Sequence, residues 1–332
     1  MASVPTDSVV LASAILGGDT RAVARAATLI ENHVPAGRDL VQRLFPHTGH
    51  ALMVGITGPP GAGKSTLASQ LIRVWRQQGR KVGVLAVDPS SPFTHGAILG
   101  DRVRMQEHHQ DPGVFIRSLA TRGRLGGVAE STMELALLLD AAAFEVILIE
   151  TVGVGQDEIE VSRLADVTVL VLTPGFGDDV QAIKAGIMEV ADIFVINKSD
   201  LPGADRLEHE IRAMQSLGAP VASPGAPRPV ASILRVVATE GIGVADLVSL
   251  IEETHRAGNH PHARVAAWEF RLQELLLARV VDLLDPSAIA AQAQRVASGQ
   301  LDPFFAVDQL LEALAERTNP ASRRPERKNP QE

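Results

Sequence analysis

Three consecutive pieces of sequence decide the fold: Ala51-Leu-Met-Val-Gly-Ile-Thr57, then Gly58-Pro-Pro-Gly-Ala-Gly-Lys64-Ser65-Thr66, then Leu67-Ala-Ser-Gln-Leu-Ile-Arg73. The first is an apolar run of strand length, and the last has the apolar spacing of a helix. Between them lies a complete G-x-x-x-x-G-K-S phosphate-binding loop, in the strand–loop–helix order that this motif requires. In such a loop the backbone N–H groups and the helix N-terminus face the phosphates, the lysine reaches the β- and γ-phosphates, and the serine hydroxyl can ligate Mg²⁺. We therefore expect a nucleoside triphosphate to bind at Gly58, Pro59, Pro60, Gly61, Ala62, Gly63, Lys64, Ser65 and Thr66.

Six further apolar runs alternate with helical patterns between residues 51 and 257. They cover residues 81–87, 114–117, 144–149, 167–172, 193–196 and 233–237. Continuous apolar strands separated by helices are typical of a parallel sheet that is covered on both faces. The sequence therefore predicts an α/β fold of the P-loop NTPase type, with a mostly parallel sheet.

The nucleotide base is indicated by Ile196-Asn197-Lys198-Ser199-Asp200, which directly follows one of the apolar runs. A carboxylate in the plane of the base accepts hydrogen bonds from guanine N1–H and its exocyclic amine. Adenine has no donor at N1 and would leave the carboxylate unpaired, which is a strong basis for rejection. We therefore expect GTP or GDP to contact Asn197, Lys198 and Asp200, although the same short motif is also compatible with a helix cap. Downstream, Val237-Ala238-Thr239 lies where a loop can close on the base edge.

Three acidic residues follow predicted strands or lie in the loops after them: Asp88, Asp101 and Glu150. The carboxyl ends of parallel strands form the ligand site of an open α/β sheet, so these carboxylates can converge near Ser65. One carboxylate can hold Mg²⁺ through its water shell and another can orient the attacking water. Each taken alone also fits a helix cap or a turn. Glu150-Thr-Val-Gly153 resembles the D-x-x-G switch of GTPases, in which Gly153 donates its N–H to the γ-phosphate, but Val154 replaces the water-positioning Gln, so we expect slow intrinsic hydrolysis.

The 332 residues divide into four regions that differ in composition and in the spacing of their apolar residues. Residues 1–45 form a helical N-terminal extension in which Asp19 is a plausible helix cap, residues 46–257 form the P-loop GTPase domain, residues 258–317 are helical again, and residues 318–332 are a disordered tail. The C-terminal region carries two apolar stripes, which fit either core packing or a subunit interface. Their members are Val265, Trp268, Leu272, Leu275, Leu276, Val280 and Leu283, then Phe304, Val307, Leu310, Leu311 and Leu314.

Composition narrows the class of protein and of partner. The formal net charge of −8 argues against a surface that binds nucleic acid or an anionic membrane, and the chain has no Tyr and only two Trp for stacking bases. The absence of Cys removes thiolate metal sites and Cys nucleophiles and fits a reducing compartment. No apolar stretch approaches the ~20 residues of a membrane helix, and the N-terminus does not resemble a secretory leader. We expect a cytoplasmic protein without a nucleic-acid or membrane partner.

Two other groups of residues are weaker candidates. His108-His109 and His260-Pro-His262 lack a third ligand at a suitable spacing, so surface histidines are favoured over a metal site. An arginine cluster around one short strand can receive a phosphate or an acidic partner, or can simply be a solvated face. Its members are Arg102, Arg104, Arg117, Arg122 and Arg124.

Six blocks of sequence closely resemble the MeaB/ArgK (MMAA) family of P-loop GTPases over roughly residues 5–285. The blocks lie at residues 58–66, 87–94, 96–105, 150–156, 174–188 and 197–200. The resemblance implies a homodimeric GTPase of the SIMIBI class, a C-terminal dimerisation region, and a chaperone role toward adenosylcobalamin-dependent methylmalonyl-CoA mutase. It also implies Mg²⁺ binding around Ser65, Asp88, Asp101 and Glu150, and a mobile switch at about Thr173–Lys184. On this basis the catalytic candidates are Lys64, Asp88, Asp101, Glu150 and Lys184.

Two positions depart from the family pattern, and two other functions remain open. His95 stands where relatives usually have Gly, and Val237 replaces a Ser in the base loop. The family name is also associated with a second function, that of a kinase in lysine, arginine and ornithine transport. A kinase requires a phospho-acceptor site, which the sequence does not reveal. Nickel insertion, a function of related G domains, is disfavoured because Cys and a His-rich tract are missing.

Overall fold

The computed structural model describes residues 5–89, 105–108, 110–121, 129–151, 157–175, 191–217, 230–258 and 261–318. Contacts within the chain divide it into two compact units, residues 1–267 and residues 268–332. The expected site residues all belong to the first unit.

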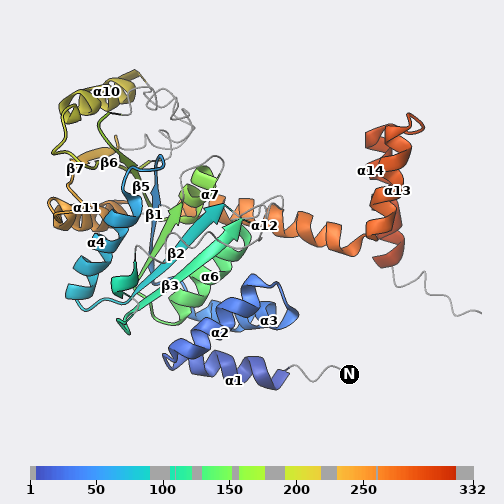
Figure 1. Cartoon of the computed structure of the whole chain (residues 1–332). Coiled ribbons are helices and arrows are strands. Elements are labelled where there is room, and N and C mark those ends of the chain that lie inside the picture. Colours follow the sequence, from blue (N-terminus) through green and yellow to red (C-terminus); the bar gives the residue numbers. More distant parts are fainter. Residues whose placement is uncertain are drawn as a thin grey trace, which may run out of the picture. The chain divides into compact units, whose positions relative to one another are not determined.

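The first unit is built on one parallel sheet of seven strands in the order β3-β2-β4-β1-β5-β6-β7 (Figure 1). The seven apolar runs of the sequence all form strands, so the predicted parallel α/β fold is confirmed. Their bounds are β1 Leu52–Thr57, β2 Val82–Pro89, β3 Val114–Thr121, β4 Val146–Thr151, β5 Val167–Leu172, β6 Ile193–Ile196 and β7 Ser232–Arg235. Because every strand runs in the same direction, all the carboxyl ends lie at one edge of the sheet.

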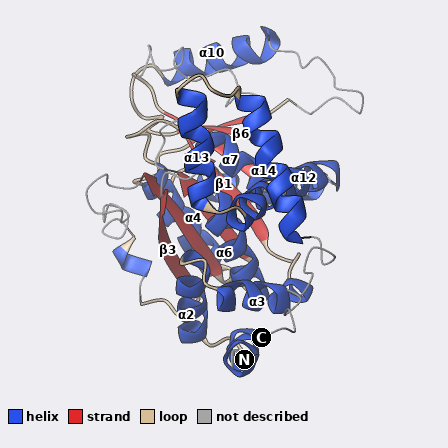
Figure 2. Cartoon of the chain, turned by 90° about the vertical axis from the view of Figure 1, so that its right-hand side faces the viewer, coloured by secondary structure: helices blue, strands red, loops and turns tan. Residues whose placement is uncertain are grey.

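Both faces of the sheet are buried beneath helices (Figure 2). Along β1, Met53 packs into one core, whereas Val54 and Ile56 pack into the other, as the two-residue period of a strand requires. The Met53 face is covered by α1 Pro5–Leu16, α2 Thr20–Glu31, α3 Pro35–Leu44, α6 Ala129–Ala141, α7 Asp157–Leu164 and α10 Ala204–Leu217. The opposite face is covered by α4 Lys64–Gln77 and α11 Val244–Ala257.

The N-terminal helices share a core with the sheet. The expected cap at Asp19 is confirmed, because its Oδ1 accepts from the N–H groups of Arg21 and Ala22 at 2.8 and 3.3 Å. Arg117 on β3 forms a half-buried ion pair with Glu31 at the end of α2. Arg117 is therefore occupied within the chain and is neither an open docking residue nor part of a solvated face, which corrects the sequence interpretation. The other four arginines of that cluster lie outside the described residues.

The second unit contains most of α12 Pro261–Leu283, then α13 Pro286–Ala297 and α14 Pro303–Thr318. Asp285 and Asp302 each precede a proline and cap the following helix, accepting from the N–H of Ser287 at 2.9 Å and from that of Phe304 at 3.0 Å. The helix α13 was not among the predicted stripes. Two short 3₁₀ turns, η1 Phe45–His47 and η2 Gln106–His108, also lie within the described ranges. Among the helices of the described ranges, none has both the length and the apolar character needed to cross a membrane.

Candidate nucleotide site

The phosphate loop leaves the carboxyl end of β1 and opens α4. Two of its glycines are required by close backbone approaches. Gly58 has φ +140°, and a Cβ there would lie 2.1 Å from the carbonyl oxygen of Val171 on β5. Gly63 has φ +87°, and a Cβ there would lie 2.4 Å from Nδ2 of Asn197. The loop is thus pressed against the two strand ends beside it, which only glycine permits.

Lys64, the first residue of α4, reaches back over its own loop. Its Nζ donates to the carbonyl oxygens of Gly58 at 2.7 Å and Pro59 at 3.0 Å, and the residue is buried. The ammonium group is therefore held over the concave backbone where the phosphates are expected. A buried cation at a helix N-terminus attracts an anionic ligand strongly.

Ser65 and Glu150 come together from α4 and the end of β4. The Ser65 hydroxyl donates to Oε1 of Glu150 at 2.6 Å, and both residues are almost fully buried. β4 lies beside β1, with Glu150 in register with Ile56, and this register places the carboxylate near the phosphate loop. A hydroxyl and a carboxylate are hard oxygen donors that fit Mg²⁺, which prefers a few protein oxygens together with water and phosphate. The described residues contain no ready-made cluster of three His, Cys, Asp or Glu ligands.

The structure describes the other expected residues of the site only in part. Asp88 lies near the end of β2, opposite Ala120 of β3, and its side chain is outside the described part. Asp101, Gly153 and Lys184 all fall outside the described residues. Thr173, where the expected switch begins, is buried immediately after β5.

Asn197 joins three segments with one side chain. Its Nδ2 donates to the carbonyl of Ala62 in the phosphate loop at 2.8 Å, and its Oδ1 accepts from the N–H of Ala238 at 3.1 Å. Next to it, Lys198 has φ +54° and donates from Nζ to the carbonyl of Gly61 at 2.9 Å. The base-binding motif and the phosphate loop are consequently held as one structure.

The side chain of Asp200 is exposed and forms no hydrogen bond or ion pair with the described residues. The loop after β7 lies beside this motif, because the N–H and the hydroxyl of Ser199 both donate to the carbonyl of Val236. Val237 and Ile242 close that loop with two backbone bonds of 3.1 and 3.2 Å, leaving Thr239 exposed at its tip. The loop after β7 therefore lies beside the Asn-Lys-Ser-Asp motif, and the contact of Asp200 with guanine stays a prediction.

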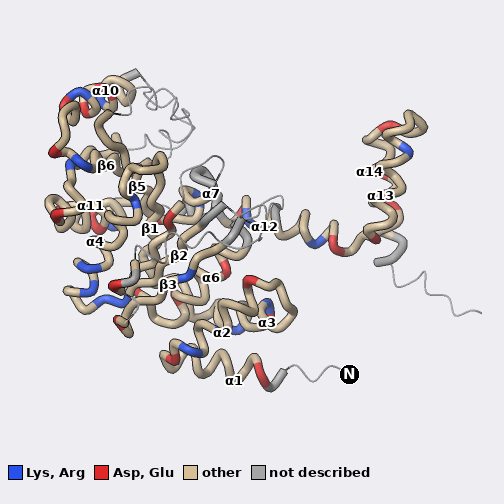
Figure 3. The backbone as a smooth tube through the Cα atoms, viewed as in Figure 1, with Lys and Arg blue, Asp and Glu red and all other residues tan. Residues whose placement is uncertain are grey.

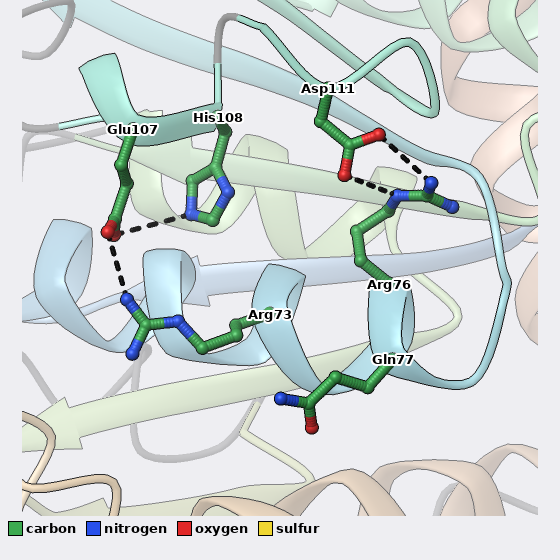
Figure 4. Close-up of a pocket in the computed structure, with 6 residues that line it drawn as sticks. All are labelled: Arg73, Arg76, Gln77, Glu107, His108 and Asp111. Carbon is green, nitrogen blue, oxygen red and sulfur yellow. Dashed lines mark hydrogen bonds and ion pairs between the residues drawn. The ribbon is translucent and has the colours of Figure 1, made fainter.

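One prediction about a histidine is wrong. His108 was expected at the surface, but it is only 7% exposed, and its Nε2 lies 2.8 Å from the hydroxyl of Ser69 on α4. It belongs to a polar pocket of about 320 Å³ on the outer side of α4, which Figure 4 shows. Sequence spacing could not reveal this contact, because the two residues are 39 positions apart. His260 lies outside the described residues, as does the side chain of His262.

A parallel α/β sheet with a phosphate loop after β1 and an Asn-Lys-Ser-Asp motif after β6 defines a P-loop GTPase. A family model described as "Methylmalonyl Co-A mutase-associated GTPase MeaB" matches residues 23–290. The chain belongs to the MeaB family. It binds guanine nucleotide and hydrolyses GTP.

Similar proteins from three domains of life carry related names. The chain is 45% identical over 305 residues to a protein of Pyrococcus abyssi named as a GTPase, covering 90% of this chain and 94% of the relative. It is 33% identical to the mouse methylmalonic aciduria type A homolog, mitochondrial, covering 92% and 79%. It is 45% identical to GTPase ArgK of Escherichia coli over a shorter match covering 55% and 56%. A solved structure described as an LAO/AO transport system kinase has a TM-score of 0.67 at 26% identity, covering 95% of this chain and all of the other.

Proposed function

We propose that this GTPase gates the loading of adenosylcobalamin into methylmalonyl-CoA mutase and protects the mutase. The observation that carries the proposal is the family match over residues 23–290, whose description names association with that mutase. The match includes every expected nucleotide-site residue and the whole of the C-terminal helix α12. The product of GTP hydrolysis is then a change in a partner protein and not a modified small molecule.

At the nucleotide, the proposed work of the chain is electrostatic. Lys64 and the backbone N–H groups of the phosphate loop stabilise the negative charge that develops on the γ-phosphate. Ser65, Asp88, Asp101 and Glu150 would hold Mg²⁺, which neutralises phosphate charge when bound. Glu150, already bonded to Ser65, is well placed to orient a water. Since Val154 stands in place of a water-positioning Gln, rapid hydrolysis requires another residue or the partner protein to position the attacking water.

Communication with the mutase is assigned to the segment Thr173–Lys184, with Lys184 as its nucleotide-responsive end. The segment follows β5, and Val171 of β5 lies close to Gly58 of the phosphate loop. A change in the phosphates can therefore alter the backbone position at the start of the segment. Gly175 has φ +97°, a backbone conformation that glycine adopts at little cost and that allows the chain to turn there. A residue near the end of this segment can then respond to GTP without contacting the base.

The protein is proposed to act as a C2 homodimer. Apolar side chains of the C-terminal helices are exposed in the single chain, and a two-fold interface would bury them. The exposed members are Val265, Leu272, Leu276, Leu277, Val281, Leu283, Phe304, Phe305, Val307 and Leu311.

The deciding experiment mixes the purified chain with apo-mutase and adenosylcobalamin and follows both GTP hydrolysis and cofactor binding to the mutase. We expect mutase to accelerate hydrolysis, and GTP to change the rate of cofactor loading. The variant Asp200→Asn presents an amide donor to the base, so its control of loading should pass from GTP to xanthosine triphosphate. Asp246→Asn, an exposed carboxylate at the start of α11, is the matched control and should still respond to GTP.

Unchanged hydrolysis and loading in the presence of mutase would refute the chaperone function while leaving the GTPase assignment intact. The similarity to a transport system kinase gives a second outcome to look for. With γ-labelled GTP, a kinase would leave the label on a protein acceptor, whereas a GTPase releases it as inorganic phosphate.

A further inference from the structure

The helices α4 and α11 begin at the two loops of the nucleotide site. α4 begins at Lys64 within the phosphate loop, and α11 begins at Val244, directly after residues 237–243, which we call the base loop. The two helices lie side by side (Figure 1 and Figure 3) and share one apolar core on the same face of the sheet. A change in the way they pack therefore changes the separation of the phosphate loop from the base loop.

Close to the site, the two loops are in contact through side chains. Asn197 donates to the carbonyl of Ala62 in the phosphate loop and accepts from the N–H of Ala238 in the base loop. On α4, Oε1 of Gln70 lies 3.7 Å from the position that a Cβ on Gly241 would occupy, so the tip of the base loop packs against this helix. The base loop is thus positioned by α4 as well as by its own strand and helix.

A second group of side chains holds the same two helices together further from the site. Nε1 of Trp75 on α4 donates to Oε1 of Glu252 on α11 at 3.3 Å, and Nη1 of Arg80 donates to the same oxygen at 2.7 Å. Trp75 is fully buried, and because an indole N–H can only donate, it requires an acceptor here. Arg80 neutralises the carboxylate that supplies it. We name Trp75, Arg80 and Glu252 the Glu252 tie.

The distance between the tie and the site makes α11 a lever for the base loop. Glu252 follows Val244 by eight residues, which corresponds to about 12 Å along the helix axis. A tilt of α11 by about 5° at the tie would move its first turn by about 1 Å. A nucleotide that reaches both loops must fit their separation, and a displacement of about 1 Å is enough to weaken such a fit.

We propose that Glu252, through Trp75 and Arg80, sets the separation of the phosphate loop from the base loop and is a positioning residue for guanine nucleotide. The inference concerns nucleotide binding and not the mutase, and it rests on the expected contact of the base with Asp200 and the base loop. Loss of the tie should weaken ligands that reach both loops and spare ligands that contact the phosphate loop alone. A tie with a structural role only would lower stability without this selectivity.

The same helix offers a matched control. Arg76 on α4 donates from Nε and Nη2 to the two carboxylate oxygens of Asp111 at 2.8 and 2.9 Å. Asp111 belongs to the segment before β3 and not to α11, so this pair fastens α4 at a place away from the base loop. Loss of the pair should lower stability and leave the separation of the two loops unchanged.

The test measures the binding of GDP and of inorganic pyrophosphate, which lacks a base, by calorimetric titration. We expect Glu252→Ala to raise the Kd for GDP about tenfold and Trp75→Phe to raise it about threefold, with the Kd for pyrophosphate within twofold of the parent in both. Glu252→Gln keeps an oxygen that accepts from Trp75 and Arg80, and so should restore most of the GDP affinity. Asp111→Asn should lower the melting temperature and leave both Kd values within twofold.

The outcomes separate a positioning role from a structural one. If Glu252→Ala melts earlier but binds GDP like the parent, or loses affinity for GDP and pyrophosphate equally, the inference is overturned. The Glu252 side chain is 31% exposed, so its variants test the tie even where Trp75→Phe folds poorly. Asp200→Asn is measured in parallel. A loss of GDP affinity in Asp200→Asn alone rejects the tie and keeps the base contact, whereas no loss in Asp200→Asn rejects both.

Discussion

At the scale of single residues, the nucleotide site depends on side chains that each satisfy two distant backbone groups. Asn197 is the clearest case, because its carboxamide uses the nitrogen on the phosphate loop and the oxygen on the base loop. Asp could accept from Ala238 but could not donate to Ala62, and Ala could do neither. The requirement for an amide here is therefore structural, whatever contact Asn197 makes with the nucleotide.

Replacing Asn197 by Ala leaves a buried carbonyl at Ala62 and a buried N–H at Ala238 without their partner. Each such group costs about 1–3 kcal/mol, so we expect the free energy of unfolding to fall by about 2–6 kcal/mol. GDP affinity should fall at the same time, because the phosphate and base loops separate. Urea unfolding and a nucleotide titration measure the two effects. Ser216→Ala, an exposed hydroxyl on α10, serves as the control, and equal stability of the two variants would contradict the role.

A second prediction at this scale concerns pH and His108. Burial is the main cause that lowers the pKa of its imidazole below 6.5, and the charge of Arg73 acts in the same direction. The negative charges of Glu107 and Asp111 oppose this shift. Below about pH 6.5 the unfolded chain binds a proton that the folded chain excludes, so the free energy of unfolding falls as the pH drops through this window. His108→Gln keeps an N–H donor toward Ser69 but does not titrate. Urea unfolding between pH 7.5 and 5.5 should therefore show a shallower pH dependence in the variant, and parallel curves would remove His108 from the explanation.

At the scale of elements, carboxylates pin the amino ends of the strands, at the edge opposite the nucleotide. Asp140 on α6 accepts from the N–H groups of Gly49, His50 and Ala51 at 2.5, 3.2 and 3.0 Å, just before β1. Asp166 accepts from Met53 at 2.9 Å, and Asp192 accepts from Thr168 at 2.8 Å. The same device repeats along neighbouring strands and fixes where each one starts.

Asp140→Asn puts an amide nitrogen where one oxygen accepts from the backbone, so at least one donor is left facing another donor. We expect a loss of about 1–3 kcal/mol of unfolding free energy for the buried N–H that loses its partner. Under conditions in which the variant is fully folded, its GDP affinity should change by less than threefold, because the substitution lies at the end of β1 far from the phosphate loop. Unfolding in urea tests the first expectation and calorimetric titration the second. A variant as stable as the parent would mean that the three bonds contribute nothing net.

The sequence predicts the seven strands and the phosphate loop because local pattern specifies both. Apolar runs such as Val167–Leu172 need only the neighbouring residues to be recognised, and the glycines of the loop have a fixed spacing. The sequence does not predict the burial of His108 or the pairing of Arg117, since both depend on partners 39 and 86 positions away. The sequence does predict that Glu150 lies near Ser65, because parallel strands bring their carboxyl ends together.

At the scale of the whole molecule, the two units differ in how they bury apolar side chains. In the described part of the chain, the first unit buries apolar side chains on both faces of its sheet, whereas the second keeps large apolar residues exposed, with Phe304 at 82%. Helices that are apolar on a face without a covering element are normally completed by another chain. The C-terminal helices therefore make more physical sense in an assembly than in a monomer.

The last prediction tests this assembly in the full-length chain. Leu272 and Leu276 lie one turn apart on α12 and are 60% and 64% exposed, so either can accept a charge without disturbing a core. In a C2 dimer each substitution occurs twice, and two buried carboxylates without partners should weaken association at least tenfold. Light scattering of Leu272→Glu and Leu276→Glu should show monomers that still bind GDP, while Gln273→Glu, on an exposed neighbouring position, stays dimeric. Truncation at about residue 260 should likewise give a monomer that binds GTP. A truncated chain that remains dimeric would move the interface to the GTPase domain.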